Sequence, residues 1–223
     1  MNIAVLVKQV NTDAGPEMDA LSRRAAAQGA ELAAAVGDGT VTAISLGPTS
    51  AEDVLRETIA WGRACSVMTE GVLVTSDAAN HATPAAAAGI LAATLASLEP
   101  FDVVLLGGRS SDDATGLLGT NLAPLLGMPF AAWARYLSVQ ARRLHVRCEH
   151  EDEWVQLTVE MPAVVSCAAD LIQPCGASPT ARALVPAELI RTVAADQLAT
   201  PTIAPTVDTH ALRVVSRTPR EPG

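Results

Sequence analysis

Two glycines separate an apolar run from an amphipathic one near the middle of the chain, between Asp102 and Gly119. Asp102–Leu106 is typical of a buried parallel strand, and Gly107 and Gly108 follow it directly. After a polar turn, leucines recur at helical spacing from Gly116 onward. The first amides of a helix have no partner within it and carry partial positive charge, and glycine lets a ligand approach the backbone. The pattern therefore predicts a phosphate site at the helix start.

Charged side chains near this stretch can contact other parts of a nucleotide. Asp112 and Asp113 can accept hydrogen bonds from ribose hydroxyls or an adenine amine. Lys8 ends a strand-like run, and strand ends face the ligand crevice of an open parallel sheet, so it can reach a phosphate. The stretch is neither a Walker loop nor a GxGxxG motif. A solvated lysine and an ordinary strand–helix turn capped by Asp or Thr explain the same residues, and both interpretations stay open.

Composition narrows the class of protein. The chain has 223 residues, of which 49% are hydrophobic and 17% charged, enough for one sizeable α/β domain with a tail. Its net charge of −9 argues against a nucleic-acid partner. Its four cysteines form no CxxC pair, so we expect neither a disulfide framework nor a zinc site. The sequence shows no signal-peptide pattern and no apolar run of membrane-spanning length, so we expect a soluble, cytoplasmic protein.

Strand-like and helical patterns alternate over the first 126 residues. Strands are expected at 3–10, 40–46, 71–75 and 102–106, and helices at 18–36, 49–61, 84–98 and 116–126. This alternation predicts an α/β fold with a doubly wound, mostly parallel sheet, the Rossmann-like architecture that binds adenine nucleotides.

From Gly127 onward the pattern becomes an alternation of apolar and polar residues. Antiparallel strands are expected at 130–139, 142–150 and 154–159, a short buried strand at 162–166, a loop at 11–16 and a short helix at 186–195. We therefore expect a nucleotide-binding α/β domain over 1–195, with its antiparallel strands within 130–166. An extended or disordered C-terminal arm is expected over 196–223.

Four segments of this chain occur in the order and spacing of a known family. They are AVLVKQV at 4–10, VTAISLGP at 41–48 with AWGRA at 60–64, the block from DVVLLGG at 102–108 to LLGMP at 125–129, and EMPAVVS at 160–166. Over residues 2–174 the chain resembles the β-subunit of electron-transfer flavoprotein. The resemblance implies pairing with an α-subunit that carries a redox FAD. It also implies that this chain holds AMP, or a second FAD as in electron-bifurcating members.

The resemblance further implies where the nucleotide lies. Matching the segments without a gap places it over the carboxyl ends of the sheet strands, with its phosphate at the amides of Gly116, Leu117 and Leu118. Including the side chains discussed above, the residues expected to bind it are Leu6, Lys8, Leu46, Gly107, Gly108, Arg109, Asp112, Asp113, Thr115, Gly116, Leu117 and Leu118. No catalytic or metal-binding residue is predicted.

The chain departs from the family pattern at several positions. The family's Asn-Gln-Thr at the phosphate is Gly-Leu-Leu at 116–118, so side-chain ligands are lost while backbone donors remain. The family's NPFxE-type insertion is missing from the short segment 11–17, and its dehydrogenase-docking loop is hardly recognisable in 176–189. These differences indicate that the chain belongs to a divergent branch of the family it resembles. One candidate for that branch is the β-like subunit associated with mycofactocin systems.

An electron-transfer subunit is the leading interpretation, and an electron carrier is favoured over a stand-alone enzyme because the chemistry of a flavoprotein belongs to the flavin. Such a subunit pairs with an α-like subunit, holds an adenine nucleotide and helps to pass electrons from a dehydrogenase. Two alternatives stay open. One is an ATP-handling or stress-type nucleotide-binding protein on the same fold, with Asp112 or Asp113 near the phosphates. The other is a scaffold subunit that has lost its nucleotide.

Overall fold

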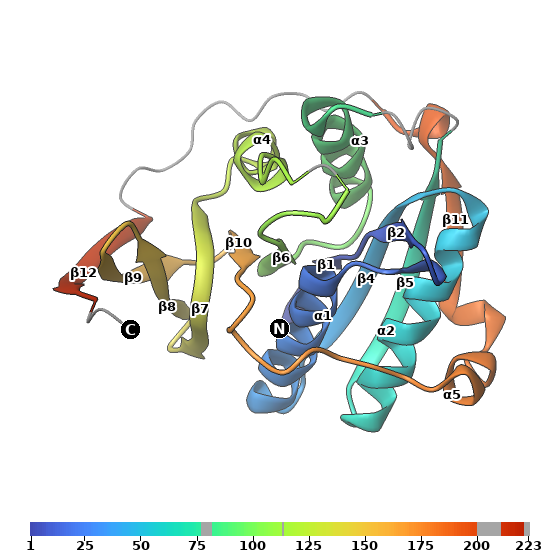
Figure 1. Ribbon diagram of the computed structural model, residues 1–223, viewed down its shortest axis with the longest axis horizontal. Helices are drawn as coiled ribbons and strands as arrows, with labels where there is room; N and C mark the ends of the chain where they lie inside the picture. Colours follow the sequence, from blue (N-terminus) through green and yellow to red (C-terminus); the bar gives the residue numbers. More distant parts are fainter. Residues whose placement is uncertain (77–81, 113, 200–210, 221–223) are drawn as a thin grey trace.

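One large sheet organises the part of the chain that the computed structural model describes, residues 1–76, 82–112, 114–199 and 211–220. Within these residues the sheet has ten strands in the order β11-β5-β4-β1-β6-β10-β7-β8-β9-β12 (Figure 1). The strands are β1 (Asn2–Leu6), β4 (Thr40–Gly47), β5 (Met68–Thr75), β6 (Val103–Gly107), β7 (Phe130–Gln140), β8 (Arg143–His150), β9 (Glu153–Glu160), β10 (Ala163–Cys167), β11 (Ile190–Ala194) and β12 (Leu212–Pro219).

The sheet is doubly wound around β1. This strand pairs with β4 on one side and with β6 on the other, so the chain builds the sheet outward in one direction and then returns to extend it in the other. Neighbouring strands from β11 to β7 run parallel, and those from β7 to β12 run antiparallel. The predicted Rossmann-like α/β fold with a C-terminal antiparallel extension is therefore confirmed.

Helices cover both faces of the parallel part. Those on one face are α1 (Ala20–Val36) and α2 (Glu52–Ala64), and those on the other are α3 (Pro84–Ala96) and α4 (Leu118–Leu126) (Figure 1). Between these layers, Val103, Val104 and Leu105 of β6 have no exposed surface. A strand covered on both faces needs an unbroken apolar run rather than an alternating one, which explains the composition of this segment.

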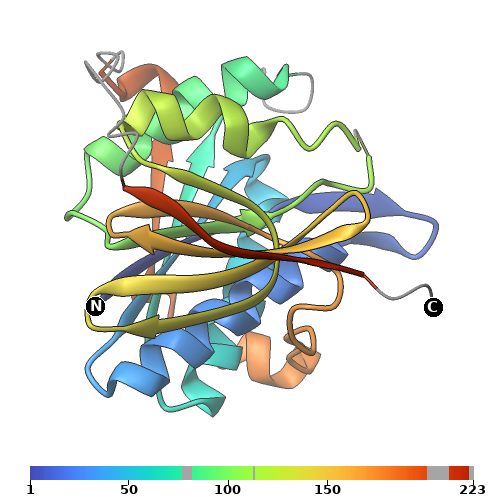
Figure 2. The same ribbon diagram turned by 90° about the vertical axis from the view of Figure 1, so that its left-hand side faces the viewer.

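The antiparallel strands β7, β8 and β9 lie beside α1. Their bounds agree closely with the predicted segments 130–139, 142–150 and 154–159. Leu137, Leu144 and Val146 join one hydrophobic cluster with the apolar side chains of α1. The side-chain amide of Gln28 on α1 donates to the carbonyl oxygen of Leu137 at 3.4 Å. Figure 2 looks onto these strands with α1 behind them, and β12 pairs along the outer side of β9.

Three local predictions are wrong. The strand expected at 3–10 is not continuous, because β1 ends at Leu6 and residues 9 and 10 belong to a separate two-stranded sheet. Residues 11–16 are not a simple loop, because β2 (Gln9–Thr12) and β3 (Gly15–Met18) form an antiparallel hairpin there. Residues 186–195 are not a helix: a 3₁₀ turn, Ala187–Leu189, leads into β11. The helical prediction failed because the outer edge of β5 is open to pairing. Residues Ile190–Ala194 form β11 and pair in parallel with that edge.

The four cysteines are unpaired thiols, as expected. Cys148, Cys167 and Cys175 are buried, whereas Cys65 is partly exposed. Burial raises the pKa of the Cys167 thiol, at the end of β10, to about 12. This side chain therefore stays neutral at physiological pH and packs as a small apolar group.

A buried carboxylate attaches the segment after β10 to α2. Glu57 on α2 is 2% exposed and forms ion pairs with Arg23 of α1 and with Arg182 of α5 (Pro179–Ala183), the latter at 3.8 Å. Arg56, also on α2, donates to the carbonyl oxygen of Val185 at 2.8 Å. Helix α5 was not predicted, although Ser178 caps it and Pro179 occupies its first turn.

We expect Glu57→Gln to lower the free energy of unfolding by about 2 kcal/mol, because the two arginines lose a buried charged acceptor. The matched control is Glu52→Gln, which removes a partly exposed pair with Arg56 on the same helix and is expected to change that free energy by less than about 0.5 kcal/mol. Urea unfolding of the three proteins measures both values. Equal effects of the two substitutions would show that Glu57 contributes no more than a surface pair.

Candidate functional site

A pocket lies at the carboxyl ends of β1, β4 and β6, where the strand order reverses. Leu6, Leu46 and Gly107, at or next to the last residue of these three strands, line it. Ligands of open α/β sheets bind in such a crevice. The pocket volume is about 120 Å³.

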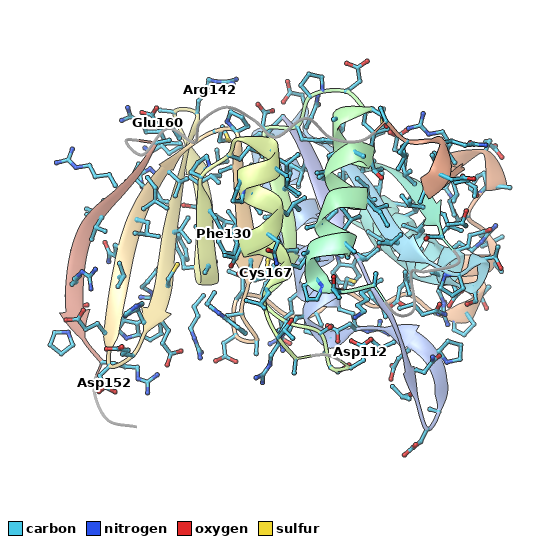
Figure 3. The ribbon with its side chains drawn as sticks, turned by 90° about the horizontal axis from the view of Figure 1, so that it is seen from above. Asp112, Phe130, Arg142, Asp152, Glu160 and Cys167 are labelled. Carbon is cyan, nitrogen blue, oxygen red and sulfur yellow. The ribbon has the colours of Figure 1, made fainter. Side chains whose placement is uncertain are left out.

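The structure brings nearly all of the expected nucleotide-binding residues together. Those that line the pocket are Leu6, Lys8, Leu46, Gly107, Gly108, Arg109, Thr115, Gly116, Leu117 and Leu118. Asp112 lies beside the pocket in contact with Lys8, in the loop that Figure 3 shows on the same side of the molecule as the β2–β3 hairpin. Asp113 lies outside the described residues. The role of these residues in binding a nucleotide stays a prediction.

One wall of the pocket is apolar. Leu6, Leu46, Leu91 and Leu118 belong to the hydrophobic cluster between the sheet and the α3–α4 layer. Pro84 at the start of α3 also lines the pocket. Such a surface suits the face of an aromatic ring. Sequence reasoning missed the contribution of α3, because this helix is apolar on all sides and its pattern does not show which face meets a ligand.

Charged residues hold the loop after β6 against the end of β1. The Lys8 ammonium donates to Ser110 Oγ at 3.0 Å and to Asp112 Oδ1 at 2.6 Å. Partial burial raises the pKa of Asp112, but the Lys8 and Ser110 hydrogen bonds outweigh it and hold this pKa below its ordinary value. Asp112 is therefore ionised at neutral pH. Lys8 contacts this loop directly, and Arg109 is exposed beside it.

Three helices, α1, α3 and α4, begin beside the pocket, and in the described part of the chain a carboxylate occupies the start of only α1. Asp19 caps α1, whereas α4 has no side-chain cap from a described residue. The turn before α4 contains Gly116 with φ of 66°, and the amide of Leu117 donates to Thr115 Oγ1 at 3.5 Å. Because the first amides of α4 have no partners within the helix, its start can accept an anion.

Asp19 is a functional candidate that sequence reasoning missed. Its side chain is buried, and Oδ1 accepts from the amides of Leu21 and Ser22 at 3.0 and 3.4 Å. Oδ2 accepts from the amide of Ser111 at 2.8 Å, so one carboxylate joins α1 to the loop that follows β6. An aspartate directly before a helical apolar pattern is the signal for a cap, but the contact with Ser111 has no sequence signal.

The two glycines after β6 are required by contacts within the protein itself. A Cβ on Gly107 would lie 2.9 Å from Cβ of Leu21, and a Cβ on Gly108 would lie 2.7 Å from the indole of Trp133. The amide of Gly108 also donates to the carbonyl oxygen of Cys167 at 2.9 Å. A Cβ at Gly107 would therefore press against the start of α1, and a Cβ at Gly108 would force the indole of Trp133 to move.

Comparison with known proteins identifies the family that has this fold and site. The family profile described as "Electron transfer flavoprotein domain" matches residues 7–197. The chain belongs to the electron transfer flavoprotein family. The electron transfer flavoprotein subunit beta of Megasphaera elsdenii is 28% identical over 191 residues, which cover 78% of this chain and 71% of that protein.

Other relatives match over a shorter region. The electron transfer flavoprotein subunit beta of Bos taurus is 30% identical over 134 residues, which cover 60% of this chain and 51% of that protein. The caffeyl-CoA reductase–Etf complex subunit CarD of Acetobacterium woodii is 28% identical over 134 residues, 60% of this chain and 49% of that subunit. The alignments with these two relatives therefore span about half of their length.

These relatives place the chain among the β-subunit-like members of the electron transfer flavoprotein family, whose function is electron transfer. Among the described residues there is no group of three or more His, Cys, Asp or Glu side chains that is arranged to hold a metal ion. None of the helices in the described ranges has the length and hydropathy that a membrane span requires.

We expect Asp19→Ala to lower the free energy of unfolding by about 2 kcal/mol, because it removes the cap of α1 together with the buried carboxylate that accepts from the amide of Ser111. The matched control is Thr83→Ala, which removes the exposed cap of α3 and is expected to lower it by about 1 kcal/mol. Thermal unfolding of both variants tests the difference. A smaller effect at Asp19 than at Thr83 would contradict the role of this carboxylate as a link between α1 and the loop.

Proposed function

We propose that this chain is the β-like subunit of an electron-transfer flavoprotein. It pairs with an α-like subunit that carries a redox FAD, holds AMP in the pocket at the ends of β1, β4 and β6, and helps to pass electrons from a dehydrogenase to an acceptor. The observation that carries the proposal is the pocket itself, which combines an apolar wall with a helix start that no described residue caps, at the point where the strand order reverses.

The residues of the pocket fit an adenylate. The phosphate would accept hydrogen bonds from the amides at the start of α4, near Gly116, and the adenine ring would pack against Leu46 and Leu91. The pocket volume of about 120 Å³ is below the roughly 300 Å³ at the lower end for ligand pockets, so the pocket encloses only part of a nucleotide.

The redox chemistry belongs to the partner in this proposal. FAD supplies the electron transfer when it is bound, and a protein tunes it by excluding water and by placing donors or charges near the flavin ring. The apolar wall and the helix start in this chain suit an adenylate and offer no such arrangement for an isoalloxazine. The names of two relatives, CarD of a caffeyl-CoA reductase–Etf complex and an acryloyl-CoA reductase electron transfer subunit gamma, support assembly with redox partners.

The first test is the cofactor content of the purified protein. We expect the full chain to release about one AMP per molecule on acid denaturation, and to carry flavin only when it is co-expressed with its α-like partner. Chromatography of the released nucleotides and the visible spectrum measure both. ATP turnover by the chain alone would support the ATP-handling alternative instead. The absence of any nucleotide would support the scaffold alternative, and a tightly bound flavin that cycles without the partner would contradict the proposed division of roles.

The second test concerns the helix start. Gly116→Ala introduces a Cβ at a φ of 66° and 3.0 Å from the carbonyl oxygen of Gly108. We expect the turn to relax away from this conformation and AMP affinity to fall about tenfold. The control is Gly89→Ala in α3, where a Cβ meets nothing within 4 Å and AMP affinity should not change. Isothermal titration of nucleotide-stripped protein measures both, and equal affinities would place the phosphate elsewhere.

A further inference from the structure

Trp133 lies at an irregularity of β7 that no sequence motif marks. Ala131 pairs with Val165 of β10, and Ala134 pairs with Cys167. Between these two pairs β7 therefore advances by three residues and β10 by two. The additional residue makes a β-bulge, in which the amide of Trp133 donates to the hydroxyl of Ser166 at 2.9 Å. Ser166 is itself buried, so the bulge is held from inside the protein.

The backbone of Trp133 adopts an unfavourable conformation. Its φ is 56°, in the left-handed region that a bulky residue rarely enters. Positive φ also occurs at Ala114 and Gly116, in the loop that Trp133 faces. Backbone strain of this kind persists where the surrounding structure enforces it, and it is concentrated at functional sites. Trp133 is also 37% exposed, so its large side chain is not retained simply to fill the core.

The bulge directs the indole onto both ends of the loop between β6 and α4. Cζ3 of Trp133 lies 2.7 Å from the position that a Cβ on Gly108 would take, and Cζ2 lies 3.7 Å from the corresponding position on Gly116. Gly108 and Gly116 both line the pocket, whereas Trp133 does not. The indole therefore lies behind the loop, on the side away from the pocket.

We propose that Trp133 is a positioning residue for the nucleotide, which holds the 108–116 loop in the form that presents the start of α4 to a phosphate. This inference rests on the proposed binding of AMP in the pocket. The indole lies close to the loop where it leaves β6 and again just before α4 begins, and it occupies the space into which a Cβ on Gly108 would project. Movement of the indole therefore moves the backbone that faces the ligand.

The first experiment separates positioning from a purely structural role. Nucleotide-stripped wild-type chain, Trp133→Ala, Trp133→Phe and the control Tyr136→Ala are titrated with AMP by calorimetry and unfolded in urea without AMP. Tyr136 lies on the same strand and is also exposed, but it does not line the pocket. We expect Trp133→Ala to weaken AMP binding about tenfold, Trp133→Phe to restore most of the affinity, and Tyr136→Ala to leave it unchanged. A loss of stability in Trp133→Ala with unchanged affinity would overturn the proposal.

The second experiment does not depend on removing Trp133. The chain has three tryptophans, and the double variant Trp61→Phe, Trp154→Phe leaves Trp133 as the single tryptophan, whose emission is excited selectively at wavelengths that tyrosine does not absorb. We expect AMP to change its emission in a saturable way, with the same dissociation constant that calorimetry gives. AMP binding without any change in emission would overturn the inference and leave the proposed function intact. If the wild-type chain binds no AMP at all, the proposed function fails and this inference fails with it.

Discussion

The close packing of the loop after β6 against α1 and β7 is the contact on which the rest of the site depends. Gly107 approaches Leu21 at the start of α1, and Gly108 approaches Trp133 on β7, at distances that leave no room for a side chain. The hydrogen bond from the Gly108 amide to the Cys167 carbonyl then joins the loop to β10. Three neighbouring elements thus determine the path of one short segment, and this path determines where α4 begins.

The electrostatics of the site follow from the same arrangement. The buried carboxylate of Asp19 occupies the start of α1, where it accepts from two amides of that helix and from the amide of Ser111. The start of α4 has no such cap from a described residue, and it lies beside the apolar wall formed by the strand ends and α3. In a chain with a net charge of −9, attraction of an anion must come from local groups rather than from the overall field. Backbone amides and Arg109 line the pocket and can provide it, whereas the charge of Lys8 is offset by its ion pair with Asp112.

The long strand β7 connects this site with the antiparallel half of the sheet. Up to Ala134 it pairs in parallel with β10 on one edge, and from Ala134 onward it pairs antiparallel with β8 on the other. Figure 3 shows Phe130 and Cys167 near the centre of the sheet, and Arg142 and Asp152 at opposite ends of the antiparallel hairpins. The bulge lies where β7 changes from parallel pairing with β10 to antiparallel pairing with β8. It also turns the side chain of Trp133 toward the loop. The shape of the pocket thus depends on strands that come later in the sequence than the residues that line it.

The sequence by itself determined the fold class, the positions of the antiparallel strands β7, β8 and β9, and the location of the glycine turn. These features follow from periodicity and from turn residues, which act over a few neighbouring positions. The sequence was misleading at 186–195, where a free edge of β5 decided between strand and helix, and at 11–16, where two short polar segments pair with each other.

Only the tertiary structure decided that Asp19 reaches Ser111, that α3 forms a wall of the pocket and that Trp133 lies behind the loop. The residues in these contacts are brought together by the winding of the sheet from positions far apart in the chain. A local pattern of residues does not predict these contacts, because each contact depends on how several separate helices and strands pack against one another.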